Sequence, residues 1–322
     1  MKSVLVTGCS GTFGQTFIAD LLQRPGVERV VGLSRDELKQ SVMASRFGHD
    51  SRLRLFLGDV RDRSRLEEAF YGCDVVVHAA ALKRVDAVAY DSDEARKTNV
   101  DGTANVIKAA IAQGVGKVVV LSSDKAVHAT NFYGATKFLA EQLAVAGNVY
   151  GYPRGTRIAC TRYGNVLGSR GSVLHVWREH LAAGRPLPLT HSDISRFWMT
   201  IQQAVELVHV ALRRMDGGEI FLPKLPGLSL RALAAAMAGP DYPLTLTGLR
   251  PGGEKLHEEL LSPGEVERTF DAGDCYVIAP SLAPWRTHQP AYGPPVPADF
   301  RYTSNGVREA GADELRAMLD GA

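Results

Sequence analysis

The chain has 322 residues, of which 45% are apolar and 22% charged, so it can bury a large core and has the composition of an ordinary globular protein. With 37 basic and 35 acidic residues the net charge is +2, and no basic run is long enough for a nucleic-acid footprint. The chain enters a strand at once, which leaves no room for a signal peptide, and no apolar run approaches membrane-spanning length. The four cysteines are scattered, which predicts neither a disulfide framework nor a metal site. We therefore expect a cytoplasmic protein that binds neither nucleic acid nor membrane.

A glycine-rich turn follows the first strand, which is expected over residues 2–7, and leads into a helix that stops before Pro25. The order strand, glycines, helix is the context of a dinucleotide fingerprint, although the spacing here is G-x-x-G-x-x-G. Gly8 would permit the tight turn, Gly11 would let backbone approach a pyrophosphate at the helix N-terminus, and Gly14 would allow close helix packing. A purely structural turn is the alternative, and the βαβ pattern around it favours a cofactor. The expected cofactor contacts in this turn are Gly8, Ser10, Gly11, Thr12, Phe13 and Gly14.

The second strand, expected over residues 29–33, ends in Ser34, Arg35 and Asp36. An acid at this point accepts hydrogen bonds from the ribose 2′-hydroxyl of NAD, whereas a nearby arginine accommodates the 2′-phosphate of NADP. Ser34 and Arg35 come first and Lys39 follows one helical turn later, so we expect NADP, while Asp36 keeps NAD open. For Arg35 the alternative is a solvated surface charge.

Strands three and four are expected over residues 53–57 and 74–78, and a capping box at 64–67 opens the helix between them. The fourth strand ends in Ala79, Ala80 and Ala81, whose small side chains leave room for a flat ring to lie against them as against a wall. A long helix over about 92–113 follows and ends at glycines.

The fifth strand, expected over residues 117–121, leads into a polar stretch, 122–137, that opens the next helix. This is the carboxyl end of a central strand, where open α/β sheets bind ligands. Tyr133 and Lys137 are four residues apart on one helix face, and the ammonium would lower the pKa of the phenol, which makes the pair an acid/base device. Asp124 and Lys125, taken alone, are typical of a strand-end turn with a local ion pair.

Strands and helices alternate through a sixth strand at 156–161, which predicts an α/β fold with a right-handed, doubly wound parallel sheet. Beyond it, glycines and prolines break the chain into short elements. We expect a dinucleotide-binding domain over 1–165 and a substrate lobe over 166–322 that interleaves with the first domain and contributes late strands. Three arginines of the lobe could hold a diphosphate or ribose, with ordinary surface pairs as the alternative: Arg170, Arg196 and Arg250. Helices are expected in the lobe over about 172–184, 201–214 and 311–320.

Several segments combine into a family pattern that covers about residues 3–280. They are Thr7-Gly8-x-x-Gly11-x-x-Gly14, 34–40, 58–62, 78–83, 97–99, 122–125, 133–137, 162–166, 168–172, 196–198 and 248–257. With these segments the chain resembles the extended short-chain dehydrogenase/reductase superfamily, and within it the inverting UDP-N-acetylglucosamine 4,6-dehydratases of pseudaminic acid and capsular L-aminosugar biosynthesis. The Asp124-Lys125 pair is the specific part of the pattern, since glucose-type dehydratases carry Asp-Glu there and epimerases have neither acid nor base at that pair. The chain departs from the family at Arg84 and Asp86, and in an extra glycine within 250–254.

The resemblance implies oxidation of the sugar at C4, elimination of water across C5–C6, return of hydride to C6, and inversion at C5. The product would be UDP-2-acetamido-2,6-dideoxy-β-L-arabino-hex-4-ulose. Tyr133, made acidic by Lys137 and by the charge of the nicotinamide, would take the 4-hydroxyl proton. Lys125, with a depressed pKa, would take the C5 proton, and Asp124, with a raised pKa, would protonate the leaving 6-hydroxyl. The implied catalytic residues are Ser123, Asp124, Lys125, Tyr133 and Lys137.

The resemblance also implies binding residues and partners. Lys137 would hold the nicotinamide ribose, and Asn99 would support a water chain behind it. Further implied cofactor contacts are Asp59, Val60, Lys83, Asn99, Tyr133 and Lys137, and the implied substrate contacts are Lys83, Tyr163, Asn165, Ser169, Arg170, Arg196, Arg250 and Glu254. The substrate would be a UDP-sugar, and the family forms homo-oligomers. Two alternatives stay open: a nucleotide-sugar 4-epimerase or reductase, and a non-catalytic NADP-binding regulator.

Overall fold

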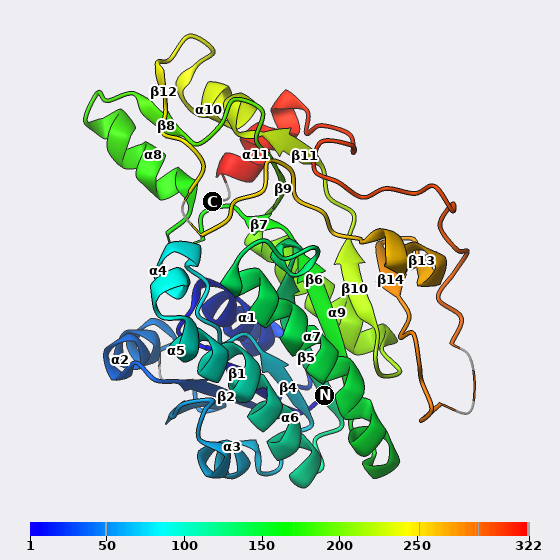
Figure 1. Ribbon diagram of the computed structural model, residues 1–322. Coiled ribbons are helices and arrows are strands. Elements are labelled where there is room, and N and C mark those ends of the chain that lie inside the picture. The colour runs from blue at the N-terminus through cyan, green and yellow to red at the C-terminus, as the bar shows by residue number, and fades with distance from the viewer. Residues whose placement is uncertain (49, 170, 251, 287, 289, 321–322) are drawn as a thin grey trace.

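A long, mostly parallel β-sheet forms the centre of the molecule in the computed structural model, which describes residues 1–48, 50–169, 171–250, 252–286, 288 and 290–320 (Figure 1). Within these residues the sheet has nine strands in the order β13-β14-β10-β6-β5-β4-β1-β2-β3. The strands are β1 (Ser3–Thr7), β2 (Arg29–Ser34), β3 (Leu53–Leu57), β4 (Val75–His78), β5 (Lys117–Ser123), β6 (Arg157–Tyr163), β10 (Ile220–Pro223), β13 (Thr269–Asp271) and β14 (Cys275–Ile278). Neighbouring strands from β3 to β10 run parallel, which confirms the predicted doubly wound α/β fold.

The first strand shows why the sheet is covered on both faces. All five residues of β1 are buried; Val4 and Val6 join one apolar cluster, whereas Leu5 joins the other, because successive side chains of a strand point to opposite faces. One face is covered by α1 (Thr12–Gln23), α2 (Glu37–Arg46) and α9 (Ile201–Arg214). The other is covered by α3 (Arg63–Phe70), α6 (Gly102–Ala112) and α7 (Phe132–Gly151). Strand order reverses between β1 and β4, so the ends of these two strands border the switch point of the fold.

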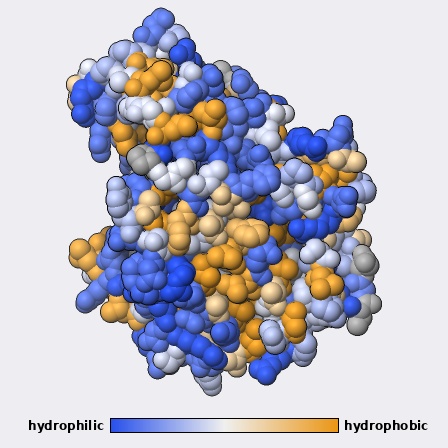
Figure 2. Space-filling model, viewed as in Figure 1, coloured by the Kyte–Doolittle hydropathy of each residue, from blue (hydrophilic) through white to orange (hydrophobic). Residues whose placement is uncertain are grey.

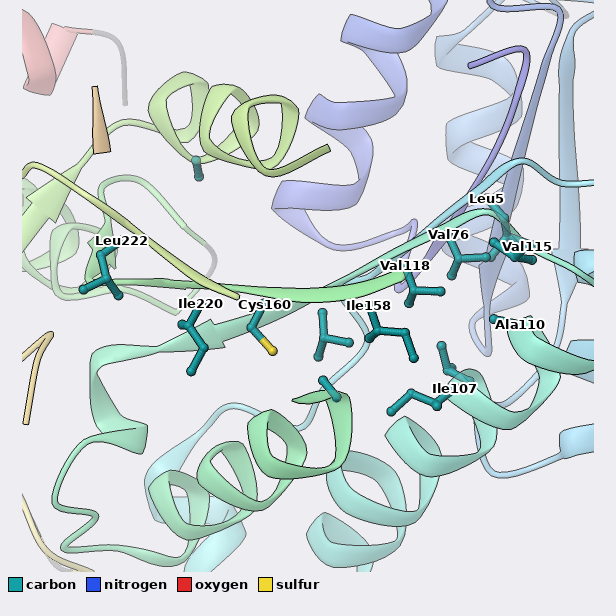
Figure 3. Packing of buried hydrophobic residues seen from close by; sticks show 14 of the residues in the cluster. Leu5, Val76, Ile107, Ala110, Val115, Val118, Ile158, Cys160, Ile220 and Leu222 are labelled. Carbon is teal, nitrogen blue, oxygen red and sulfur yellow. The ribbon is translucent and has the colours of Figure 1, made fainter. Parts of the chain in front are cut away.

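Figure 3 shows one of the two cores from close by. Side chains from four adjacent strands point to the same face, among them Leu5, Val76, Val118 and Ile158. Ile107 of α6 packs against them. The cluster continues along the sheet to β10 with Ile220 and Leu222, which are likewise buried. The core therefore joins the first half of the chain to a strand that belongs to the second half.

A smaller lobe stands over the carboxyl end of the sheet (Figure 1). Its short strands are β7 (Asn165–Val166), β8 (Leu187–Leu189), β9 (Ser195–Met199), β11 (Gly227–Ser229) and β12 (Leu244–Leu246), and its helices are α8 (Val173–Ala182), α10 (Leu230–Ala238) and α11 (Ala312–Asp320). They pack around a separate cluster that contains Trp177 and Trp198. The chain after residue 166 also contributes three strands to the main sheet, β10, β13 and β14.

Three local predictions differ from the structure. The sheet is not parallel throughout, since β14 runs antiparallel to both β10 and β13. The long helix predicted over 92–113 is α5 (Ser92–Arg96), one π-helical turn at Lys97–Asp101, and α6. The predicted capping box is wrong: α3 begins at Arg63, and the side chain of Asp62 accepts from the backbone N–H of Arg65. The acid at this earlier position serves as the cap.

Apolar side chains lie exposed along α7. Figure 2 shows apolar side chains gathered where α7 crosses the front of the molecule, and its large exposed residues include Phe138, Leu139, Val149 and Tyr150. No helix in the described part of the chain combines the length and the apolar character needed to cross a bilayer. The remaining short elements are α4 (Val85–Tyr90) and the 3₁₀ turns η2 (Asp124–Ala126), η3 (Tyr152–Arg154) and η4 (Pro263–Arg268).

Candidate active site

The predicted stretch 122–137 folds back on itself at the end of β5. The strand ends at Ser123, η2 carries Asp124 and Lys125, and α7 begins at Phe132. Asn131 caps this helix, with its side chain accepting from the backbone N–H of Gly134 at 2.8 Å. A side chain at Gly134 would overlap the carbonyl oxygen of Lys125, so glycine is needed for the helix to lie directly against η2. The fold thereby brings the residues of this stretch to one place.

Asp124 and Lys125 form an ion pair in which the acid is completely buried and the lysine is partly buried. The Asp124 carboxyl is completely buried, and its Oδ1 accepts from Ser123 Oγ at 2.8 Å and from Lys125 Nζ at 2.9 Å. Its Oδ2 has no hydrogen-bond partner among the described residues. Burial raises the pKa of Asp124 and outweighs the opposing ammonium of Lys125, which is the direction expected for an acid.

Lys125 differs from its prediction. Burial lowers the pKa of its amine, but the carboxylates of Asp124 and Glu258 outweigh burial and hold the pKa above its usual value. The expected depressed pKa is therefore wrong for the protein without its ligands. Lys125 is held as an ammonium, and a base role requires that this proton leave first.

Tyr133 and Lys137 are both buried. Burial raises the pKa of Tyr133 to about 12; Lys125 and a hydrogen bond between Tyr133 and Ser123 oppose this shift without overcoming it. Lys137 Nζ donates to the Leu121 carbonyl oxygen at 2.5 Å, and burial lowers the pKa of Lys137 to about 8. In the protein without its ligands the phenol is therefore not acidic, because it lies in a desolvated site and the cation that lowers its pKa is Lys125.

Glu258 is the site residue that sequence reasoning missed. Its side chain is buried, with Oε1 3.5 Å from Lys125 Nζ and 4.0 Å from Arg196 Nε. Asn165, predicted to contact substrate, accepts a 3.1 Å hydrogen bond from the same Lys125 amine. The family segment 248–257 ends one residue before Glu258. This closeness to a segment already expected at the substrate was the signal in the sequence that could have pointed to Glu258.

Asn99 lies between the loop after β4 and α7, and its predicted support of a water chain stays a prediction. Its side-chain oxygen accepts from the Leu82 N–H at 2.8 Å, and its amide nitrogen donates to the Leu82 oxygen at 2.9 Å and to Thr136 Oγ1 at 3.0 Å. Asn99 is almost fully buried, and these bonds use both N–H groups of its amide. It ties the loop after β4 to α7.

Buried His78 joins the ends of β1 and β4. Its Nδ1 lies 2.7 Å from Thr7 Oγ1, and its Nε2 lies 3.0 Å from Thr103 Oγ1. Thr103 donates its hydroxyl proton to the Asn99 carbonyl at 2.6 Å, so it accepts from Nε2–H of His78, and Nδ1 accepts from Thr7. Burial lowers the pKa of His78 to about 3, which agrees with a neutral ring.

The glycine-rich turn has the geometry of a phosphate site. Gly8 has φ +66°, and a Cβ there would lie 2.8 Å from the Ala80 backbone, so the turn and the alanine wall are in direct contact. A Cβ at Gly14 would lie 2.6 Å from the Gly8 oxygen, whereas at Gly11 it would meet only that oxygen, at 3.2 Å. Gly11 is the N-cap of α1 and provides no side-chain cap, and the first turn of α1 carries no acid. The backbone N–H groups at the start of α1 could therefore bind a pyrophosphate. The other residues predicted here lie in the same turn, Ser10 buried and Thr12 and Phe13 opening α1.

The end of β2 brings the predicted ribose residues together. Ser34 is buried, and its Oγ accepts from Gln40 Nε2 at 3.0 Å. Arg35 pairs with Asp59 at 3.4 Å on the surface. Asp36 caps α2 by accepting from the Lys39 N–H at 2.9 Å, and its other oxygen pairs with Lys39 Nζ. Both oxygens of this acid are therefore engaged within α2. The neighbouring Val60 is buried against Gly102.

One buried and one exposed arginine of the predicted substrate residues pair with the same carboxylate. Arg196 is buried and pairs with Glu254 at 2.9 Å, so the alternative of an ordinary surface pair is wrong for this residue. The more exposed Arg250 pairs with the same Glu254 oxygen at 2.5 Å. Tyr163 is the neighbour of Ser123 across the β5–β6 pairing. Ser169 lies in the loop after β7 and Lys83 is exposed after β4, while Arg170 lies outside the described residues.

Comparison with known proteins shows which family this chain belongs to. The family model described as "Polysaccharide biosynthesis protein" matches residues 4–280. The chain is 42% identical over 282 residues to the UDP-N-acetylglucosamine 4,6-dehydratase (inverting) of Campylobacter jejuni strain 81-176, covering 87% of this chain and 84% of that protein. It is 37% identical to the UDP-glucose 4-epimerase of Rickettsia typhi over 283 residues, covering 86% and 82%. The X-ray structure of Pen from Bacillus thuringiensis superimposes with a TM-score of 0.91 at 34% identity, covering 99% of this chain and 97% of that one. The chain therefore belongs to the family of polysaccharide biosynthesis proteins to which this model and these relatives point.

Proposed function

We propose that the chain is an inverting UDP-N-acetylglucosamine 4,6-dehydratase. The observation that carries this proposal is the buried Asp124–Lys125 pair at the end of β5, whose 2.9 Å contact puts an acid and an amine side by side. Its support is the 42% identity to a relative named for that activity. Elimination of water needs one group to take a proton and another to give one, and an adjacent pair in a shared buried site supplies both.

A nicotinamide dinucleotide fits the turn between β1 and α1. The uncapped N-terminus of α1 and the open space at Gly11 would hold its pyrophosphate, and the wall at Ala79–Ala81 would adjoin its ring. When bound, the cofactor supplies a hydride acceptor for C4 and a donor for C6. NADP is favoured over NAD because Asp36 uses both carboxylate oxygens inside α2, while the exposed Arg35 is available for a 2′-phosphate.

The chain's own side chains would move the protons. Tyr133, once its own phenol proton has left, takes the proton of the 4-hydroxyl while Ser123 hydrogen-bonds the oxygen. A cationic ligand beside the phenol would favour this phenolate, because it would oppose the pKa rise that burial causes. The resulting 4-ketone acidifies the C5–H. Lys125, as a neutral amine, takes that proton, and Asp124 gives its own to the leaving 6-hydroxyl as water departs. The buried Oδ2 of Asp124, which has no hydrogen-bond partner among the described residues, is a ready position for that hydroxyl.

The lobe would hold the UDP part of the substrate. Arg196 and Arg250 share one carboxylate, that of Glu254, so the group keeps a positive charge that suits a diphosphate. The exposed apolar residues of α7 support a homo-oligomer in which a second copy covers this face.

A 4-epimerase is the competing function, and the 37% identity to the Rickettsia typhi UDP-glucose 4-epimerase favours it. Epimerisation uses Tyr133 and the cofactor but assigns no work to Asp124 and Lys125. Mass separates the two functions, because an epimerase leaves the mass of the sugar nucleotide unchanged.

The test is incubation with NADP and UDP-N-acetylglucosamine, followed by mass spectrometry and NMR. We expect the loss of one water, deuterium at C5 when the reaction runs in heavy water, and ring couplings of the inverted sugar. A product of unchanged mass would show the epimerase, and a dehydrated product without deuterium at C5 would exclude proton abstraction there.

A further inference from the structure

Glu258 is a buried carboxylate that the proposed chemistry does not use. Besides its contacts to Lys125 and Arg196, its Oε2 lies 3.5 Å from Lys255 Nζ. Its backbone N–H donates to Ser304 Oγ at 2.9 Å, which fixes the residue in place. Burial raises the pKa of Glu258, but the three cations outweigh burial and keep it below the usual value, so the group stays ionised.

Glu258 is one of several groups that face the Lys125 amine. The other groups that face it are Asp124 from η2, Asn165 from β7, Arg196 from β9 and the Tyr133 phenol from α7. The three oxygens of Asp124, Asn165 and Glu258 match the three N–H bonds of an ammonium. A neutral amine would have to turn its lone pair toward one of these oxygens, so the arrangement selects the charged form.

Glu258 also acts on Asp124. Its negative charge is one of the causes that raise the pKa of the Asp124 carboxyl. The two acids that flank Lys125 therefore differ. Three cations hold the pKa of Glu258 below its usual value, whereas burial raises the pKa of Asp124, so Asp124 is the stronger proton acceptor of the two.

Resting on the dehydratase function, we propose that Glu258 is a positioning residue: its fixed charge holds the Lys125 amine in place, so that one N–H of Lys125 stays pointed at Asp124 and can pass its proton there. The transfer runs along the 2.9 Å hydrogen bond between Lys125 Nζ and Asp124 Oδ1. One N–H bond breaks and one O–H bond forms, so ammonium and carboxylate become amine and carboxylic acid without exchange with solvent. A single transfer creates both the base for C5 and the acid for the 6-hydroxyl.

The proposal predicts a characteristic pH profile. The active form of the pair carries one proton in total, so turnover rises as the pair loses its first proton and falls as it loses its second. Replacing Glu258 by glutamine removes a negative charge that favours both protons. In Glu258→Gln both limbs of the profile of kcat/KM should move to lower pH, by about one unit. A purely structural role would lower the height of the profile and leave both limbs in place.

Two further variants sharpen the comparison. Glu259→Gln makes the same chemical change one residue away, where the side chain pairs with the exposed His128, and should reproduce the wild-type limbs. Glu258→Asp keeps the charge but withdraws it from Lys125, so its limbs should lie between those of wild type and Glu258→Gln. This variant also serves if Glu258→Gln does not fold. Limbs that stay in place in these Glu258 variants, or that move to higher pH, would overturn the proposal.

A measurement without substrate separates this inference from the proposed reaction. The Lys125 side chain is 20% exposed, so acetic anhydride can label it and peptide mass spectrometry can follow its labelling against pH. The midpoint should fall by about one pH unit in Glu258→Gln relative to wild type. If wild type does not dehydrate UDP-N-acetylglucosamine, the proposed function fails, and this labelling still decides on Glu258. An unmoved midpoint would reject the Glu258 role even if dehydration is observed.

Discussion

The Asn131 side chain that caps α7 also donates a 2.9 Å hydrogen bond to the Gly253 carbonyl oxygen, so one residue joins the helix of Tyr133 to the lobe. Beside it, Lys255 Nζ donates to the Val127 carbonyl oxygen. The segment 253–259 therefore runs against the loop that follows η2. It carries both Glu254 and Glu258, which links the arginines of the lobe to Lys125.

The extra glycine of the 250–254 segment has a structural reason at Gly253. Its φ is +95°, and any Cβ there would overlap the Thr130 carbonyl oxygen. Gly253→Ala should lower the free energy of unfolding by about 1–3 kcal/mol and reduce turnover, since the segment must move away from η2. Urea denaturation and initial rates measure the two effects. Gly264→Ala, where nothing lies within 4 Å, is the matched control, and equal stability of the two variants would contradict the prediction.

Arg35 should distinguish the two cofactors. If its guanidinium holds a 2′-phosphate, Arg35→Ala should weaken NADPH binding by about tenfold and leave NADH binding almost unchanged. Fluorescence titration with both reduced cofactors gives the two dissociation constants. Arg54→Ala removes an exposed arginine of β3 and should affect neither. Equal weakening of NADPH and NADH would remove the argument for NADP.

Lys125 should be needed for elimination but not for oxidation at C4. In Lys125→Ala, dehydration should fall by at least about a hundredfold, because the base is lost. Addition of UDP-N-acetylglucosamine to the NADP-bound variant should still produce reduced-nicotinamide absorbance, since Tyr133 remains. Lys224→Ala, which removes a lysine paired with Asp271 far along the chain, should behave as wild type. Normal water loss in Lys125→Ala would exclude it as the base.

Much of the fold could be predicted because its signals are local. Five buried residues in β1, the glycines after it and the alternation with helices describe a parallel sheet without tertiary information. The antiparallel edge could not be predicted in this way, because β13 and β14 are only three and four residues long and lie among prolines and glycines. The direction of β14 is set by its pairing with β10, and that of β13 by its pairing with β14.

The sequence motifs predicted which residues form the site, but they did not predict the protonation states of those residues. Asp124 and Lys125 are adjacent in sequence, so their contact was expected. Glu258 reaches Lys125 from 133 positions away, and together with Asp124, whose effect is larger, it holds the Lys125 pKa above its usual value, against the predicted direction. Asn99 likewise finds its partners through the fold, on Leu82 and Thr136. Protonation depends on burial and on neighbours that only the tertiary structure brings together.

Lys137 should make stability depend on pH in a direction that can be calculated. Burial lowers its pKa to about 8 in the folded chain, against 10.5 for an ordinary lysine. Between these values the unfolded chain holds a proton that the folded chain has released, so the free energy of unfolding rises with pH; below about pH 8 the folded chain carries the full cost of the buried ammonium. The difference between wild type and Lys137→Met should therefore move by about 3 kcal/mol in favour of wild type from pH 7 to 10.5. Urea denaturation across this range measures it, with Lys108→Met at an exposed position of α6 as the control. A difference that stays flat with pH would show that Lys137 is not held in a desolvated site.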